Sequence, residues 1–412
     1  MDRQVRVLLL TNNNFCGTSG GSALLRSLFH NFDRGQLFVV SNSVAGENGN
    51  LEHRLRLTSL LPRKRLLKLL TRLLLNALRN RVLPSFQEII NIVIQGSKYS
   101  LAKRAHQKIG HFKPDLIYAW AGDSKWANFI NDIVAVYNIP LVVHFMDNHF
   151  GLKGGSYTEK LLNEEYRKNI IKVLAKMDSI FTISDAMGFA YSKKFGKSYE
   201  VFHALIDKSS WKFPDKTRPT CVFRITFSGS VEAGQINSIR DVAAAVEQLN
   251  NEGFKIELML CVTEYYEKQI SPGLQEFKHV RYHRHPDFSG LRSVLTNSDV
   301  LLLAYGFDPI TVDYYRYSFA TKLVPYMLSG RCILAYGPET VEPIKYLKKG
   351  GWSHMVTQYG VEDLTKAIRI LINNPDKRQQ YARLAYDHGV LEHDIEKNSA
   401  RFMDALCKIA FR

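Results

Sequence analysis

A strand, a glycine-containing loop and a helix follow one another twice in this chain, once in each half. In the first half, the apolar run 5–11 leads into the loop NNNFCGTSGG and then into a helix that begins at Ser22. In the second half, the strand 221–227 leads into the loop SGSVEAG and a helix over 238–249. A buried parallel strand that ends in such a loop before a helix opens a Rossmann-like unit. The sequence therefore predicts two α/β domains.

The length of 412 residues agrees with two domains, because a single hydrophobic core rarely grows beyond about 250–300 residues. We predict an N-terminal Rossmann-like domain over 1–206 and a linker over 207–220, where the sequence is polar and contains proline. A second Rossmann-like domain is predicted over 221–390, and a last helix within 391–412.

A basic segment rich in leucine interrupts the first domain. Between residues 52 and 81 there are nine Lys or Arg and one Glu, a net charge of +8 out of +16 for the whole chain. A helix at about 60–81 would put leucines on one side and cations on the other, which suits an anionic membrane surface. The alternative is a core-facing helix with a solvated basic face. The candidate membrane-surface residues are Arg63, Lys64, Arg65, Lys68 and Arg72.

The cysteines and the apolar runs of the sequence indicate where in the cell the protein is located. The five cysteines are scattered and show no metal or redox spacing, which favours a reducing cytoplasm. The start MDRQVRVLLL lacks the long apolar region of a signal peptide, and no apolar run reaches the roughly 20 residues of a membrane-spanning helix. We therefore expect a cytoplasmic protein, bound peripherally to the inner face of the cell membrane.

Polar residues follow two predicted strands of the first domain. His144 and Asp147 lie at and just past the end of PLVVH, and ligands collect at the carboxyl ends of strands in open α/β sheets. A histidine can relay a proton near neutral pH, and a carboxylate can orient a hydroxyl group. Ser184 follows the next strand and is a good N-cap for a helix over 185–195. Structural roles for all three residues stay open.

The stretch 318–338, SFATKLVPYMLSGRCILAYGP, is predicted to form a helix, a glycine stop and a buried strand. Ser318, Thr321 and Lys322 lie at the start of that helix. Unpaired backbone N–H groups at a helix start favour an anion, and a lysine adds a full positive charge. An ordinary helix with a solvated lysine is the alternative.

The pattern S-F-x-x-K-L-x-x-Y-M-x-S-G-R-x-I-L-A-Y-G-P resembles the donor-binding segment of retaining glycosyltransferases with the GT-B fold, family four in particular. The turn TISDAM and the strand SDVLLLAY resemble further segments of that family. The resemblance implies two Rossmann-like domains that face each other across a cleft, with a C-terminal helix that crosses back to the first domain. It also implies that the 318–338 segment embraces the diphosphate and ribose of a nucleotide sugar.

The resemblance also implies roles for single residues. The residues expected at the sugar-transfer site are His144 and Asp147. Those expected in the cleft loop on the acceptor side are Asn13, Gly17, Gly20, Gly21 and Ser184. Those expected around the donor are Gly229, Ser230, Arg240, His285, Ser318, Thr321 and Lys322. Three positions depart from the family. Ser230 replaces a common arginine, for which Arg240 is a possible substitute, and Tyr317 and Pro325 replace two glutamates.

The function that this resemblance implies is hexosyl transfer from a nucleotide sugar to a glycan or lipid-linked saccharide, in the synthesis of a cell-surface polysaccharide such as lipopolysaccharide or capsule. Retention of anomeric configuration is implied, and we expect neither a metal nor another cofactor. The alternatives are a non-catalytic GT-B protein that binds a sugar nucleotide or a partner, a DNA-modifying glycosyltransferase, and a sugar-nucleotide epimerase of the same fold.

Overall fold

The computed structural model separates the chain into two compact units, which are described one at a time. Unit 1 is Met1–His203 with Ser399–Arg412, and unit 2 is Ala204–Asn398. The residues that the structure describes are 4–12, 15, 20–41, 53–56, 58–60, 63–80, 85–96, 98–120, 122, 124–148, 157–214, 221–231, 234–286 and 288–412.

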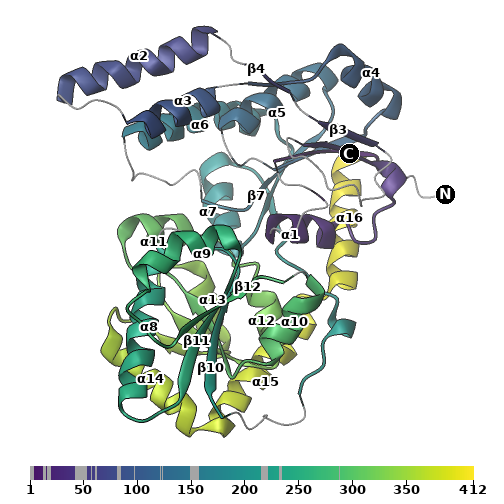
Figure 1. The fold of residues 1–412 in the computed structure, drawn as a ribbon. Helices are drawn as coiled ribbons and strands as arrows, with labels where there is room; N and C mark the ends of the chain where they lie inside the picture. The colour runs from purple at the N-terminus through teal and green to yellow at the C-terminus, as the bar shows by residue number, and fades with distance from the viewer. Residues whose placement is uncertain are drawn as a thin grey trace. The chain divides into compact units, whose positions relative to one another are not determined.

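Unit 1 is built on a parallel sheet of seven strands (Figure 1). In spatial order the strands are β3 (His53–Arg56), β2 (Leu37–Ser41), β1 (Val7–Thr11), β6 (Leu116–Trp120), β7 (Leu141–Phe145), β8 (Ser179–Thr182) and β9 (Tyr199–Val201). A separate antiparallel pair consists of β4 (Thr58–Leu60) and β5 (Lys98–Ser100). Every residue of β1, β2, β6 and β7 is buried, which explains why these strands are almost continuously apolar.

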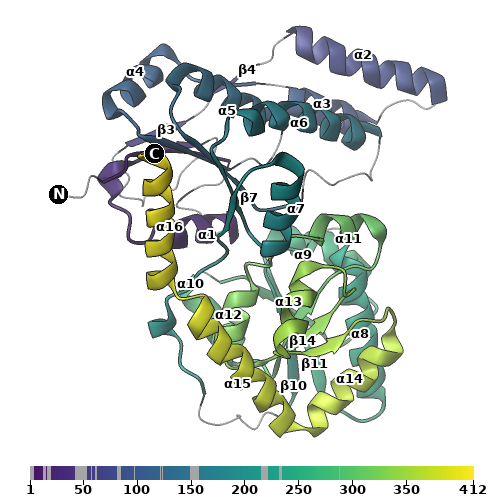
Figure 2. The same ribbon diagram turned by 180° about the vertical axis from the view of Figure 1, so that it is seen from behind.

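Helices cover both faces of this sheet (Figures 1 and 2). The helices of unit 1 are α1 (Gly20–Leu28), the short η1 (Arg34–Gln36), α2 (Arg63–Asn80), α3 (Phe86–Gly96), α4 (Lys103–Phe112), α5 (Ser124–Tyr137), α6 (Tyr157–Lys176), α7 (Asp185–Phe195) and most of α16 (Ile395–Ala410). The predicted N-cap is confirmed, because the Ser184 hydroxyl accepts the Met187 N–H at 3.1 Å. The sequence predicts that the apolar run 89–94 lies beside a helix, but the structure places this run within α3 itself.

Unit 2 repeats the architecture with six parallel strands. In spatial order they are β12 (Val280–Arg284), β11 (Ile256–Val262), β10 (Phe223–Ser228), β13 (Val300–Ala304), β14 (Cys332–Tyr336) and β15 (His354–Val356). Their helices are η2 (Lys208–Ser210), α8 (Gln235–Asn251), α9 (Glu264–Ile270), η3 (Ser271–Gly273), α10 (Phe288–Thr296), α11 (Pro309–Tyr315), α12 (Leu323–Leu328), α13 (Glu342–Gly350), α14 (Val361–Asn373) and α15 (Pro375–Glu392). The core lies between the sheet and α8 and α14.

One stretch of unit 2 differs from what its sequence predicts. The sequence of residues 306–317 predicts an irregular loop, but the structure forms α11 there. The Asp308 carboxylate accepts the Thr311 backbone N–H at 2.9 Å, and Pro309 occupies the first turn. An aspartate N-cap followed by proline is a good helix start.

No helix in the described ranges combines the length and apolar character that crossing a bilayer requires.

The last helix, α16, fills an aromatic core in unit 1. Phe402 is fully buried, and its ring centroid lies 5.0 Å from that of Phe29, 5.1 Å from Phe202 and 5.5 Å from Tyr118. Edge-to-face rings at these separations are attractive beyond the burial of their area. Unit 1 therefore uses a segment distant in sequence to close its core.

We predict that Phe402→Ala lowers the free energy of unfolding of the protein by about 3–5 kcal/mol, because it leaves a cavity among these three rings. Urea denaturation followed by circular dichroism measures the change. Phe411→Ala is the matched control, since Phe411 follows the same helix and is 42% exposed. Equal stability of the two variants would contradict the packing role of α16.

Candidate functional site

The strongest candidate site in unit 2 lies where β10 ends. The strand finishes at Ser228, and Gly229 follows with a φ of +107°, a conformation that L side chains rarely adopt. A Cβ atom built on Gly229 would lie 3.3 Å from both Cε and Nζ of Lys322. Glycine at this position lets the lysine side chain run along the loop.

Lys322 is held at this loop by two contacts. Its ammonium group donates to the carbonyl of Ser230 at 3.3 Å and lies 3.8 Å from the centroid of the Phe227 ring. Lys322 immediately precedes α12, as the sequence predicts. Because α12 has only six residues, the lysine charge rather than the helix dipole dominates the local potential.

Tyr326 was not among the candidate residues, yet it ties α12 to the site. Its hydroxyl accepts the backbone N–H of Ser228 at 2.8 Å, and the side chain is almost fully buried. Burial raises the pKa of Tyr326, so the phenol stays protonated. Tyr326 follows Lys322 by one helical turn, and this spacing was the available signal for a side chain on the same side of α12.

The loops after β10 and β13 touch through their backbones. A Cβ atom on Gly306 would lie 2.3 Å from the carbonyl oxygen of Gly234, and one on Gly234 would lie 1.7 Å from Oγ1 of Thr311. The Ser238 hydroxyl donates to the Tyr305 carbonyl at 2.8 Å, which fastens the start of α8 to the end of β13. The loops after β10 and β13 are therefore held together.

His285 is the other donor candidate near Lys322. Its Nδ1 donates to the Pro286 carbonyl at 2.8 Å. Burial lowers the pKa of His285, and the positive charges of Lys322 and His283 lower it further, against a rise caused by the Pro286 carbonyl. The imidazole is therefore neutral at pH 7, and the fixed Nδ1–H leaves Nε2 as a hydrogen-bond acceptor.

The remaining donor candidates are placed differently. Arg240 forms an exposed ion pair with Glu276 at 2.5 Å. The Ser318 hydroxyl is buried and donates to the Tyr314 carbonyl at 3.1 Å, at the end of α11. Thr321 is half-buried beside Lys322. Of the predicted set, the structure thus gathers Gly229, Ser230 and His285 around the lysine.

In unit 1, His144 lies in the core rather than at the surface. The side chain is fully buried, and Nδ1 forms a hydrogen bond with the hydroxyl of Tyr118 at 2.5 Å. Burial lowers the pKa of His144 to about 3, although the carbonyls of Phe202 and Thr182 partly oppose this change. Such an imidazole is a weak base without solvent access. A catalytic role for His144 stays a prediction that this position does not favour.

The other candidates of unit 1 are partly described. Asp147 is partly exposed two residues beyond β7, and Ser184, a buried N-cap, follows the neighbouring strand β8, so both belong to the carboxyl edge of the sheet. Gly20 and Gly21 form the first residues of α1. Asn13 and Gly17 lie outside the described residues.

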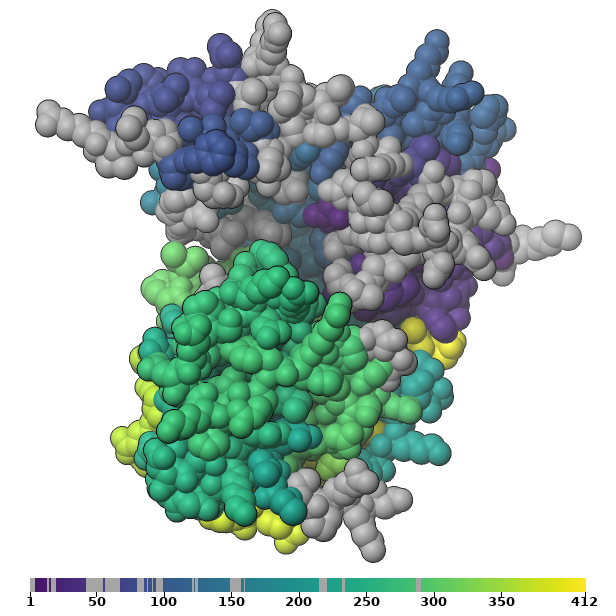
Figure 3. Space-filling model, viewed as in Figure 1, coloured from purple at the N-terminus to yellow at the C-terminus, as the bar shows by residue number. Residues whose placement is uncertain are grey.

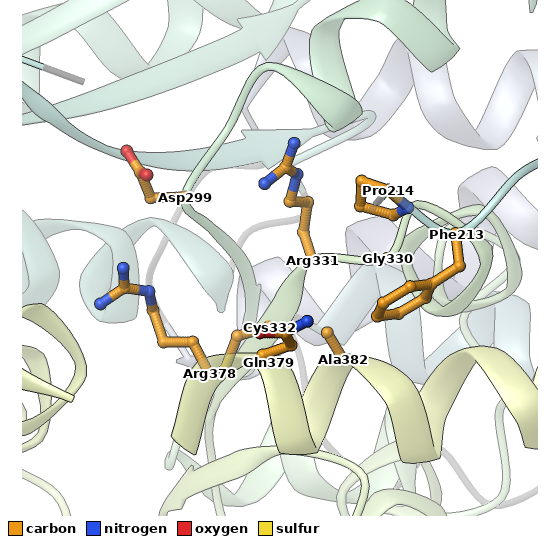
Figure 4. A pocket seen from close by; sticks show the side chains of 9 residues that line it. All are labelled: Phe213, Pro214, Asp299, Gly330, Arg331, Cys332, Arg378, Gln379 and Ala382. Carbon is orange, nitrogen blue, oxygen red and sulfur yellow. The ribbon is translucent and has the colours of Figure 1, made fainter. Parts of the chain in front are cut away.

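A second depression in unit 2 lies at the opposite edge of the sheet (Figure 4). Asp299, Arg331 and Cys332, at the amino ends of β13 and β14, line it together with Arg378 of α15. Arg378 donates to the Ile372 carbonyl at 3.1 Å, at the end of α14, so this cation serves the fold. In the part of the chain that the structure describes, no group of three His, Cys, Asp or Glu side chains could hold a metal ion.

We predict that Tyr326→Phe costs about 1–3 kcal/mol of unfolding free energy, because it leaves the buried Ser228 N–H without its acceptor. Thermal or urea denaturation of the full chain measures this. Tyr265→Phe is the control, since Tyr265 is 65% exposed. If both variants had the same free energy of unfolding as the parent protein, Tyr326 would not anchor the loop after β10.

The depressed pKa of His144 predicts a pH dependence of stability. Above about pH 6.5 the histidine is neutral in both the folded and the unfolded state. As the pH falls toward 3, the unfolded chain binds a proton that the folded chain excludes, so stability is lost. At pH 5 this loss amounts to about 2 kcal/mol relative to pH 7.

His144→Gln keeps a group that can form a hydrogen bond with Tyr118 but does not titrate, so the stability of this variant should fall less between pH 7 and pH 5. Urea denaturation at both pH values measures the difference. The control is His111→Gln on the exposed surface of α4. A parallel decline of the His144→Gln variant and the parent would show that His144 does not cause the pH dependence.

No protein-family model matches the sequence, and no curated protein sequence matches it. Solved structures do match. The HepE protein of Anabaena in complex with UDP-glucose has a TM-score of 0.65 at 15% identity, with 98% of this chain and 99% of that chain covered. Sucrose-phosphate synthase from Thermosynechococcus elongatus has a TM-score of 0.69 at 11% identity, with 98% of each chain covered.

The trehalose-6-phosphate synthase of E. coli, bound with UDP-2-fluoro glucose, has a TM-score of 0.60 at 11% identity and covers 98% of this chain and 99% of its own. These neighbours are GT-B glycosyltransferases. At such low identity the likeness concerns the fold. The predicted fold class is confirmed: this chain has the α/β GT-B fold, with a Rossmann-like sheet in each unit.

Proposed function

We propose that this protein is a glycosyltransferase that takes a sugar from a nucleotide-sugar donor, and that unit 2 binds the donor. The observation that carries the proposal is the position of Lys322, whose ammonium group lies against the glycine loop at the carboxyl end of β10. Ligands bind at this edge of doubly wound sheets. The GT-B neighbours, which are glycosyltransferases, support the same class of reaction.

In the proposed reaction the bond between the anomeric carbon and the diphosphate oxygen breaks, and a bond from the same carbon to the acceptor oxygen forms. The proton of the acceptor hydroxyl passes to the leaving diphosphate, on which negative charge develops. Lys322 would stabilise that charge, and the backbone N–H groups at the start of α8 would add to it, since no side chain caps that helix. This arrangement requires no metal ion for the leaving group. Metal independence is accordingly part of the proposal.

The proposed donor is a UDP-hexose. HepE binds UDP-glucose and UDP in solved structures, and the trehalose-6-phosphate synthase binds UDP-2-fluoro glucose. The neutral His285 would offer an acceptor nitrogen to the base or ribose on one side of Lys322. Tyr317 and Pro325 stand where the resembled family has glutamates, so the ribose contact would come from other groups.

The acceptor is proposed to be a glycan or a lipid-linked saccharide in cell-surface polysaccharide synthesis, and transfer is proposed to retain the anomeric configuration. Both statements rest on the resemblance of the 318–338 segment to family four. Asp147 is the candidate of unit 1 to orient the acceptor hydroxyl, because it is partly exposed at the strand edge. A cytoplasmic location, peripheral to the membrane, belongs to the same proposal.

A second candidate is a non-catalytic protein that binds a sugar nucleotide. The observation that favours it is the replacement of the family's two glutamates by Tyr317 and Pro325. Slow hydrolysis of a UDP-sugar by the purified protein distinguishes the two candidates. Hydrolysis supports the enzyme, and binding without hydrolysis or transfer supports the binding protein.

We predict that UDP and UDP-glucose raise the melting temperature of the protein, and that Lys322→Ala removes most of this shift. Loss of a charge-assisted contact weakens binding by roughly 10- to 100-fold. A thermal-shift titration against UDP-, GDP-, ADP- and CMP-linked sugars measures the effect.

The matched control is Lys255→Ala. Lys255 is exposed just before β11, at the amino edge of the same sheet, so its removal should leave the shift intact. An unchanged shift in the Lys322→Ala variant would reject the donor role of Lys322. Absence of any shift with all four nucleotide series would reject the nucleotide-sugar proposal as a whole.

A further inference from the structure

The helix α2 carries two separate apolar surfaces. One of them packs inside unit 1, where Leu69 and Leu73 are 2% and 3% exposed and form a small core with Ile92 of α3 and Leu161 of α6. The ion pair between Arg72 and Glu165 of α6, at 3.9 Å, lies beside this packing. Internal packing therefore accounts for only part of the leucines of α2.

The second apolar surface faces away from that core. Leu67, Leu74, Leu75 and Leu78 are 68%, 52%, 61% and 76% exposed. Positions 67, 74 and 78 are spaced by seven and four residues, so these side chains lie along one side of the helix. In Figure 3 the side chains of α2 form part of the surface of unit 1. Phe86 at the start of α3 adds a ring that is 78% exposed.

Cations border these leucines. Lys68 and Arg79 are exposed and are spaced by eleven residues, about three helical turns, so they share one side of α2 next to Leu75. The sequence of α2 contains six Lys or Arg and no acid. The helix α2 thus has an apolar stripe beside a basic band, and its opposite side packs inside unit 1. This pattern is typical of a helix that lies in the plane of an anionic membrane.

We propose that α2 is a docking surface for an anionic lipid bilayer, with Leu67, Leu74, Leu75 and Leu78 inserted among the acyl chains and Lys68 and Arg79 at the headgroups. This surface is distinct from the donor site at Lys322, and the proposal does not rest on the proposed transferase activity. The four exposed leucines favour this interpretation of the basic helix over a helix that serves only the core.

The positive charge of α2 indicates which partner binds to its exposed surface. A neutral apolar partner would supply no counter-charges to the exposed Lys68 and Arg79, whereas anionic headgroups would supply them. Six basic residues in eighteen make α2 too polar to cross the bilayer, so it lies along the surface.

The test is co-sedimentation of the full chain with lipid vesicles. We expect binding to phosphatidylcholine vesicles that contain about 30 mol% phosphatidylglycerol, and much weaker binding to phosphatidylcholine alone. The double variant Leu74→Asn with Leu78→Asn, which keeps the net charge, should lower the partition coefficient at least roughly five-fold. Lys68→Gln with Arg79→Gln should lower it and reduce its salt dependence.

The matched control is Leu384→Asn with Leu391→Asn. These leucines of α15 in unit 2 are 43% and 61% exposed, so the substitutions remove comparable apolar surface elsewhere. Binding of the control should stay within about two-fold of the parent protein. Thermal melting of each variant shows that the fold is kept.

Three results would overturn the proposal. The first is equal partitioning of the Leu74/Leu78 variant and the parent protein, or no binding to anionic vesicles. The second is a dimer in light scattering without lipid that the Leu74/Leu78 variant dissociates, which would make the surface a self-association face. The third is a duplex-DNA gel shift that only the Lys68/Arg79 variant abolishes, with no lipid binding.

Discussion

Burial of parallel strands on both faces is the constraint on which the rest of this structure depends. The strands β1, β6, β7, β13 and β14 are buried along their whole length, so they have almost no room for polar side chains. Polar groups therefore gather where the strands stop. At the end of β10 this principle brings Gly229, Ser230 and Lys322 to one place, and a buried phenol, Tyr326, holds that place together.

The same constraint explains what the sequence could and could not predict. Continuous apolar runs located most strands, and a serine before a helix located the start of α7, because both signals are local. The run 89–94 is equally apolar but lies in a helix, since a short apolar run cannot distinguish a strand from a buried helix face. Asp308 and Pro309 were a local signal for the start of α11, but the aromatic residues that follow them hid the helical pattern.

The candidate site was predictable in part. Lys322 follows from its place before a helix, and its contact with the Gly229 loop agrees with that expectation. The direction of a side chain near the end of a strand is harder to predict. His144 lies one residue before β7 ends and still points into the core, next to Tyr118. The ion-pair partner of Arg240 could not be predicted either, because Glu276 comes from a distant segment of the chain.

The backbone contact between the loops after β10 and β13 has a consequence for how a ligand would be received. Gly234 and Gly306 approach so closely that only a hydrogen atom fits as a side chain at either position, and Thr311 closes the space beside them. Loops that are already immobilised lose little conformational entropy when a ligand arrives. Such a site is preorganised. A change of ligand preference would then come more readily from exposed side chains such as Ser230 than from the backbone at Gly234 and Gly306.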